Sequence, residues 1–98
     1  MIAGALAWLD GRRKVVAVEP ETCVALNAGL EAGKAVDVEV SGVAANALGA
    51  RRIGSICLDL AQTHGVTSVT VSDDAITAAQ HALWNDARQL VEPAGATA

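Results

Sequence analysis

The sequence predicts one α/β domain, organised as a partial parallel sheet in three layers with helices on both faces of the sheet. Three observations carry this prediction. Helical and strand patterns alternate along the chain, which is typical of parallel sheets with right-handed helical crossovers. The segment Arg13–Val18 is rich in β-branched residues and apolar on both faces, as a buried parallel strand is. A length of 98 residues allows a single domain, residues 1–98.

The first third of the chain reads as helix, strand and helix. Ile2–Leu9 has helical composition, and Asp10-Gly11 can end that helix with the glycine in the left-handed conformation, although no capping residue stands in front of it. The strand Arg13–Val18 follows. Thr22 is the candidate N-cap of the next helix, which Gly33 ends. One face of that helix carries Cys23, Leu26 and Leu30.

The spacing of the apolar residues changes twice in the middle of the chain. Residues 35–40 alternate apolar and acidic side chains, which predicts a half-exposed extended segment, and the small residues of 41–52 predict a loop. From Ile53 the apolar residues follow the spacing of an amphipathic helix, which His64-Gly65 ends. The predicted apolar stripe is Ile53, Ile56, Cys57, Leu60 and Ala61.

The last third repeats the strand and helix order. Val66–Val71 is a second β-branched strand, and Ser72, with two aspartates behind it, is predicted to cap the next helix. This helix is expected to end at Glu92-Pro93, where proline opens another helical turn. Its predicted core face is Ile76, Ala79, Leu83, Ala87 and Leu90. Because two strands make too small a sheet for these helices, we expect a domain truncated at both ends.

Charge and cysteine usage exclude several classes of protein. The net charge is -4, and basic residues cluster only at 12–14 and 51–52, so we expect no nucleic-acid partner. The apolar stretch that opens the chain lacks a basic region in front of it and is too short to cross a bilayer, so we expect no membrane partner. Cys23 and Cys57 form no metal-binding or redox motif, which favours two buried thiols in a cytoplasmic protein.

Four motifs occur in a fixed order: "VVAVEPE", "GARRIG", "VTVSDDAI" and "VEPAGA". Together they resemble the C-terminal half of the large domain of fold-type-II pyridoxal-phosphate enzymes, the tryptophan synthase β-like fold, and within it the threonine/serine dehydratase group. The resemblance implies pyridoxal 5'-phosphate as cofactor and a small hydroxy amino acid as substrate. The implied reaction is β-elimination of water to give a 2-oxo acid and ammonia. The implied partner is a second copy or the missing part of the enzyme.

The resemblance also assigns a metal ligand. The glutamate that matches Glu19 helps to bind a divalent cation in some relatives, with a backbone carbonyl at the position of Cys23 and an acidic residue at that of Ala25. Alanine offers no side-chain oxygen, whereas such cations prefer several oxygen ligands. Two alternatives stand beside this hypothesis, because Glu19 could pair with a local arginine or cap the helix that begins near Thr22.

Two cofactor contacts follow from the same resemblance. Ala47 lies where relatives bring a loop backbone close to the cofactor, and Glu92 matches a glutamate near the cofactor. A plain surface loop and a simple helix boundary are the respective alternatives. No catalytic residue is assigned, because neither Lys14 nor Lys34 stands in the Ser-Phe-Lys context of the family's Schiff-base lysine.

Two functional hypotheses remain. The first is a fragment of a pyridoxal-phosphate-dependent threonine/serine dehydratase that is inactive alone. The alternative is a non-catalytic small α/β binding or interaction module derived from that fold. Unpaired strand edges favour the first hypothesis, since an independent module needs its sheet edges covered.

Overall fold

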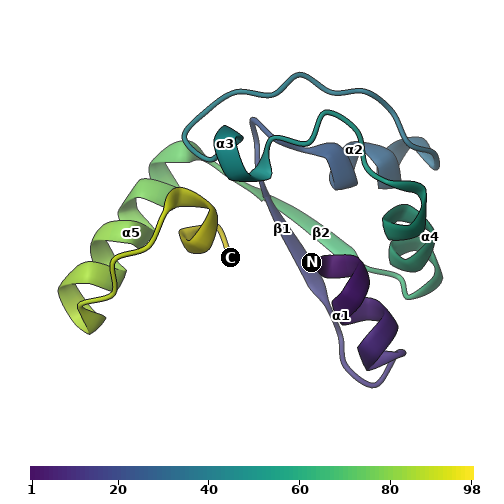
Figure 1. Ribbon diagram of the computed structural model, residues 1–98, viewed down its shortest axis with the longest axis horizontal. Coiled ribbons are helices and arrows are strands. Elements are labelled where there is room, and N and C mark those ends of the chain that lie inside the picture. Colours follow the sequence, from purple (N-terminus) through teal and green to yellow (C-terminus); the bar gives the residue numbers. More distant parts are fainter.

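The computed structural model describes all residues, 1–98, and confirms the alternation of helices and strands (Figure 1). In chain order the elements are α1 (Ile2–Leu9), β1 (Val16–Pro20), α2 (Ala25–Ala32), α3 (Ala45–Leu48), α4 (Ser55–Thr63), β2 (Thr67–Val71), α5 (Asp73–Ala87) and the 3-10 turn η1 (Pro93–Ala96). No helix of the chain is long and apolar enough to cross a membrane.

The sheet consists of β1 and β2, which pair in parallel as the alternation predicts. The register runs from Val16 beside Thr67 to Pro20 beside Val71. Both strands therefore end at the same level, so the segments that follow them share one edge of the sheet.

Three helices cover one face of the sheet. Leu6 of α1, Leu26 of α2 and two residues of α4, Leu58 and Ala61, bury against Ala17 of β1. Because side chains alternate along a strand, Glu19 points to the same face as Ala17. This small cluster of three leucines and two alanines is the hydrophobic core of the chain, and it contains no aromatic side chain.

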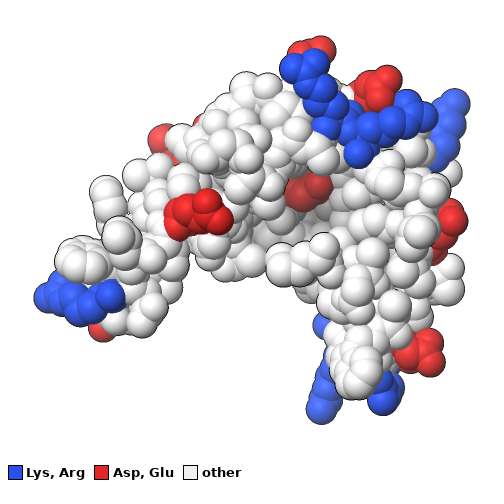
Figure 2. All heavy atoms as spheres, viewed as in Figure 1, with Lys and Arg blue, Asp and Glu red and all other residues white.

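The opposite face is covered by α5 and η1 at one end only, which agrees with the predicted partial sheet with helices on both sides. Its side chains alternate with those of the core, and Val16 and Val69 are 47% and 41% exposed. Only its carboxyl end is covered, where Val71 borders the same hollow as Ile76 of α5 and Ala96 of η1. Figure 2 shows this concave side of the molecule, between α5 and α1, lined mainly by uncharged side chains.

Helix α5 extends away from the sheet, and its predicted core face is confirmed only in part, because Ala79 and Leu83 are half-buried whereas Ala87 is exposed. Only Ile76 is buried, and Leu90 is 89% exposed and lies outside the helix. The helix ends at Ala87 because Arg88 adopts the left-handed conformation, with φ at 53° and its N–H bonded to the carbonyl of Trp84. The expected end at Glu92-Pro93 is five residues too late. Pro93 does open a short helical turn, η1, as predicted.

Other predicted features of the chain agree with the structure only in part. The 41–52 stretch contains the one-turn helix α3, and the 35–40 segment is extended but forms only one bridge, from Asp37 to Arg52. In α4 the exposed fraction of Ile56 is 72%, so the predicted stripe is wrong at that position. The Ser72 cap is confirmed, because its hydroxyl accepts a hydrogen bond from the N–H of Ala75. Helix α1 does end at Asp10-Gly11, but Asp10 already adopts the left-handed conformation, with φ at 44°, ahead of Gly11 at 74°.

Candidate functional site at the carboxyl edge of the sheet

Three hydrogen-bonded polar side chains lie at or near the shared carboxyl edge of β1 and β2: those of Glu19, Thr22 and Asp73. The N–H of Glu21 donates to the carbonyl of Val71 at 2.9 Å, so the strands stay paired up to their last residues. Thr22 and Asp73 each lie two residues beyond a strand end. In open parallel sheets such edges hold ligand-binding groups.

Asp73 fastens a loop to this edge. Its Oδ1 accepts a hydrogen bond from the hydroxyl of Thr22 at 3.4 Å, and its Oδ2 accepts one from the N–H of Val43 at 3.2 Å. The N–H of Ser41 adds a bond to the carbonyl of Thr22 at 3.1 Å. The start of α5, the end of β1 and the loop at 41–43 therefore form one hydrogen-bonded unit, which we call the Asp73 latch (Thr22, Ser41, Gly42, Val43 and Asp73).

Gly42 is required by the Asp73 latch. Its φ is +84°, and a Cβ at this position would lie 2.4 Å from Oγ1 of Thr22 and 2.6 Å from Oδ2 of Asp73. Sequence reasoning placed Asp73 only at the start of a helix and missed its role in the latch. The signal was present, because Thr22 and Asp73 stand at equal distances from the ends of two strands that pair in register.

Glu19 caps helix α2 from the neighbouring strand. Its Oε1 accepts the N–H of Leu26 at 2.9 Å and its Oε2 accepts the N–H of Asn27 at 2.8 Å. The helix itself has no side-chain cap at Val24, and Thr22, the predicted N-cap, bonds to Asp73 instead. The carboxylate therefore serves two first-turn donors and also opposes the positive end of the helix dipole.

The capping alternative for Glu19 is thus the one that the hydrogen bonds support. Ala25 is buried and contributes no oxygen, and nowhere in the chain do three His, Cys, Asp or Glu side chains lie close enough to hold a metal ion. A metal-binding role for Glu19 stays a prediction, and its remaining ligands would have to come from outside this chain or from main-chain oxygens.

Ala47 and Glu92, the predicted cofactor contacts, lie in separate places. Ala47 is exposed in α3, where its N–H bonds to the carbonyl of Ala44. Glu92 is exposed directly before η1, and its carbonyl accepts the N–H groups of Gly95 and Ala96. No hydrogen bond or ion pair joins either residue to Glu19. Both cofactor contacts therefore stay predictions.

Neither lysine fits the amine that pyridoxal phosphate requires. Lys14 is exposed at the amino end of β1, and up to about 20 Å of extended chain separates it from the carboxyl edge. Lys34 is exposed beyond the far end of α2, whose length is about 12 Å. Neither lysine therefore lies at the carboxyl edge of the sheet.

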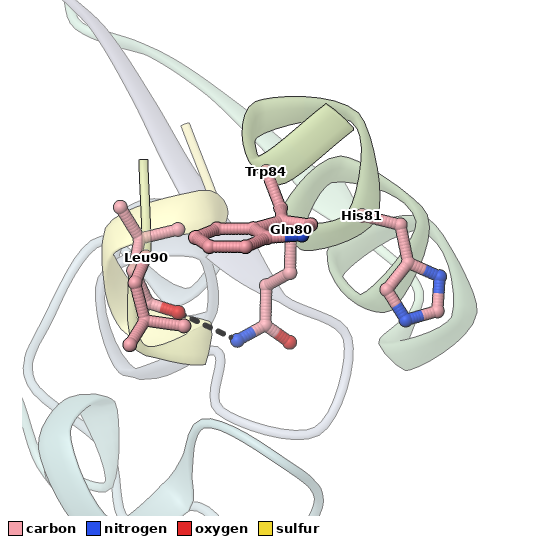
Figure 3. A pocket seen from close by; sticks show the side chains of 5 residues that line it. Gln80, His81, Trp84 and Leu90 are labelled. Atoms are coloured by element: carbon pink, nitrogen blue, oxygen red, sulfur yellow. Dashed lines mark hydrogen bonds between the residues drawn. The ribbon is translucent and has the colours of Figure 1, made fainter. Parts of the chain in front are cut away.

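A separate hollow of about 380 Å³ lies on α5, away from the carboxyl edge. Trp84, Leu90 and Gln80 line it, and the amide of Gln80 donates to the carbonyl of Val91 at 2.8 Å. Figure 3 shows that the imidazole of His81 points away from Trp84 and Leu90. The hollow thus offers an indole face and little charge, which does not suit a phosphorylated cofactor.

The one resolved pKa shift also lies away from the edge. Burial raises the pKa of the Cys57 thiol, and the nearby amino terminus opposes this effect. Cys57 is only half-buried, unlike Cys23, which is fully buried, and both thiols are free. A raised pKa disfavours the reactive thiolate, so Cys57 is no candidate nucleophile.

Comparison with known proteins matches residues 2–98 to the family described as "Pyridoxal-phosphate dependent enzyme". The chain is 42% identical over 85 residues to the L-threonine dehydratase biosynthetic IlvA of Salmonella typhimurium and 41% identical over 85 residues to that of Escherichia coli. These alignments cover 87% of this chain and 16% of each enzyme. The crystal structure of a fungal L-serine ammonia-lyase from Rhizomucor miehei superimposes with a TM-score of 0.89 at 28% identity, over 97% of this chain and 31% of that one.

These matches agree with the resemblance carried by the four motifs and with the parallel sheet. The chain spans about a sixth of the length of the dehydratases that it matches. Because the family match extends over essentially the whole chain, this protein belongs to the family of pyridoxal-phosphate dependent enzymes.

Proposed function

We propose that this chain forms part of the wall of the cofactor site in a dehydratase that removes water from L-threonine or L-serine, giving a 2-oxo acid and ammonia. The observation that carries this proposal is the identity of 41–42% to two L-threonine dehydratases over 87% of the chain. The cofactor, when bound, supplies the electron sink that makes the elimination feasible.

The residues of this chain have positioning roles in the proposal. The Asp73 latch holds the loop at 41–43, and with it α3 and Ala47, next to the carboxyl edge. Ala47 would offer main-chain groups to the cofactor, and Glu92 would place a carboxylate near it. Glu19 keeps α2 in place and, in the same proposal, is the ligand that this chain would contribute to a divalent cation.

The chain alone is proposed to be inactive. Both of its lysines are exposed and far from the carboxyl edge, so no side chain there can form the imine with the cofactor. Activity then requires the rest of the enzyme, and a homo-oligomer is the proposed form of the completed protein. A cytoplasmic location is supported by the two free cysteines, since disulfides are rare in reducing compartments.

A graft tests the proposed function. In the E. coli L-threonine dehydratase, the matching segment is replaced by residues 2–98 of this chain, and 2-oxo acid formation from L-threonine and L-serine is measured. The expected hybrid folds, binds pyridoxal phosphate and eliminates water from one or both substrates. A folded hybrid that binds the cofactor but forms no 2-oxo acid contradicts the proposal and favours the non-catalytic module.

A second measurement tests inactivity of the isolated chain. Pyridoxal phosphate is added, the mixture is reduced with borohydride, and lysine labelling is mapped by mass spectrometry. We expect only slow, substoichiometric labelling, equal at Lys14 and Lys34, because both are solvated. Rapid stoichiometric labelling of one lysine, lost in the corresponding Lys→Arg variant, would show that this chain holds the cofactor unaided.

A further inference from the structure

Helix α5 holds a second segment in addition to the loop at 41–43. The side-chain amide of Gln80 donates to the carbonyl of Val91 at 2.8 Å, which lies in the chain that follows the helix (Figure 3). Both residues are half-buried, so water competes less for this hydrogen bond than it does on an open surface. We call this contact the Gln80 clip (Gln80 and Val91).

The chain reverses its direction at the end of α5. Arg88 adopts the left-handed conformation there, with φ at 53°. The three residue steps from Arg88 to Val91 span about 10 Å when extended, and the rise of the helix from Gln80 to Ala87 is also about 10 Å. The returning segment therefore runs back along the helix as far as the level of Gln80 (Figure 1).

The Gln80 clip fixes the main chain next to Glu92. Val91 is held on one side of Glu92, and on the other side Ala96 is buried and borders the same hollow as Ile76 of α5. The carbonyl of Glu92 accepts the N–H groups of Gly95 and Ala96, which closes the turn η1. The side chain of Glu92 is exposed. Its carboxylate therefore stands on a fixed main chain and is accessible to a group from outside this chain.

Asp73 and Gln80 lie on the same face of α5. They are seven residues apart, and seven residues complete almost two turns of an α-helix, so their side chains project in nearly the same direction about 10 Å apart. Asp73 fastens the loop at 41–43, which leads into α3 and Ala47, and Gln80 fastens the segment that leads into Glu92. One face of a single helix thus holds both segments that the family resemblance assigns to the cofactor.

We propose that Gln80 is a positioning residue of the cofactor site: through Val91, its amide sets the place of the Glu92 carboxylate relative to the loop that Asp73 holds. This rests on the proposed function, since only there does Glu92 face the cofactor. Gln80 itself touches neither the cofactor nor the substrate. The competing interpretation is a purely structural bond, which stabilises the end of α5 and has no effect on cofactor affinity.

Amide hydrogen exchange of the full chain, followed by NMR, tests whether the clip fixes the segment. Gln80→Met keeps the length of the side chain and removes the donor, whereas Gln80→Lys keeps an N–H donor. Gln80→Met should accelerate exchange about threefold to tenfold at Gly95 and Ala96, whose N–H groups bond to Glu92. Exchange at Val43, which Asp73 holds, should stay unchanged. Gln80→Lys should restore the slow exchange of the parent protein.

The grafted E. coli dehydratase tests the consequence for the cofactor. In the graft, Gln80→Met should raise the dissociation constant of pyridoxal phosphate about threefold to tenfold. It is measured by equilibrium dialysis at a temperature at which all variants are folded. The matched control is Gln89→Met, because Gln89 is an exposed glutamine of the returning segment. Gln89→Met and Gln80→Lys should each change the dissociation constant by no more than about twofold.

Three results would overturn the role of Gln80. These are unchanged exchange at Gly95 and Ala96 in Gln80→Met, equal cofactor affinity of the Gln80→Met and Gln89→Met grafts, and absence of rescue by Gln80→Lys. Should Gln80→Met fail to fold, Gln80→Asn, whose amide is one carbon closer to the helix, takes its place under the same criteria.

Failure of the proposed function gives a different result. A graft that binds the cofactor, forms no 2-oxo acid and loses cofactor affinity in Gln80→Met refutes the function and leaves the role of Gln80 standing. A graft that forms 2-oxo acid and binds the cofactor equally in both methionine variants does the reverse.

Discussion

Removal of the Glu19 carboxylate is the most direct test of how strand and helix are joined in this protein. The two oxygens accept the N–H groups of Leu26 and Asn27 at 2.9 and 2.8 Å, and the helix has no other side-chain cap. Glu19→Ala leaves both donors without a protein acceptor. Glu19→Gln keeps the shape and one acceptor oxygen but removes the charge and one of the two bonds.

The size of the expected stability loss follows from these contacts. A capping bond contributes about 1 kcal/mol, and the charge near a helix N-terminus contributes about 0.5 kcal/mol when the group is half-buried. For Glu19→Ala we expect a loss of about 2–3 kcal/mol in the free energy of unfolding, against roughly 1–1.5 kcal/mol for Glu19→Gln. Domains of this size have a total stability of about 5–15 kcal/mol, so the alanine variant loses a large fraction of it.

Thermal unfolding followed by circular dichroism measures the effect. About 4–8 °C of melting temperature corresponds to 1 kcal/mol in a domain of this length, so Glu19→Ala should melt roughly 10–20 °C lower. Hydrogen exchange at Leu26 and Asn27 should accelerate more than at the core residue Leu58. The matched control is Glu21→Ala, because Glu21 is the neighbouring exposed carboxylate and its side chain caps nothing; its effect should stay within about 0.5 kcal/mol.

Equal stability of Glu19→Ala and Glu21→Ala would refute the capping role. A different pattern would support the metal-ligand prediction: Mg²⁺ or Ca²⁺ raises the melting temperature of the parent chain, this rise is absent in Glu19→Ala, and the two proteins melt together in chelator. The capping interpretation requires the difference to persist in chelator.

Three further predictions concern other parts of the chain. Gly42→Ala should lower the free energy of unfolding by about 2–4 kcal/mol in urea denaturation, since the new methyl group collides with Thr22 and Asp73 of the latch and the backbone has a left-handed φ. The control is Gly33→Ala, which has a φ of +69° but no atom within 4 Å of the new Cβ. It should lose only about 1 kcal/mol, the cost of the backbone conformation alone. Burial raises the folded-state pKa of Cys57, so the contribution of this thiol to stability is complete below its unfolded-state pKa and is lost as pH rises through its folded-state pKa. The free energy of unfolding, measured from pH 7 to 10, should therefore decline in the parent protein and decline less in Cys57→Ala. An identical decline in both proteins would contradict this prediction. The Asp37–Arg52 ion pair at 3.0 Å joins side chains that are 78% and 56% exposed, so water and salt screen the attraction between them. Asp37→Asn should therefore change the free energy of unfolding by less than about 1 kcal/mol. A larger loss that persists in high salt would contradict this reasoning.

Much of the fold could be predicted from local pattern. The β-branched segments are strands, and the hydroxyl of Ser72 caps α5, because both signals depend on neighbouring residues alone. The burial of α4 could not be predicted in the same way. Its apolar residues allow more than one buried face, and contact with α1 and the sheet selects Leu58 and Ala61 and leaves Ile56 exposed.

The end of α5 and the contacts of the candidate site could not be predicted from local sequence pattern either. Arginine has no preference for the left-handed conformation that Arg88 adopts, so the end of the helix carried no local signal. At the site, the sequence indicated that Glu19 lies at a carboxyl edge and that Asp73 starts a helix. Capping by Glu19 was one of the alternatives, but the sequence did not identify the donors, because Leu26, Asn27 and Val43 all donate from the main chain and side-chain patterns do not report which N–H groups lie within reach.

Asp73 occupies two structures at once, being the first residue of α5 and the anchor of the loop at 41–43. Ile76, the one buried residue of α5, lies close to that end, and Gln80 bonds to Val91 further along the helix. The first turn of α5 and the loop at 41–43 are therefore joined through one carboxylate. A displacement of this turn would therefore also displace the loop, although Asp73 and Val43 lie 30 residues apart in the sequence.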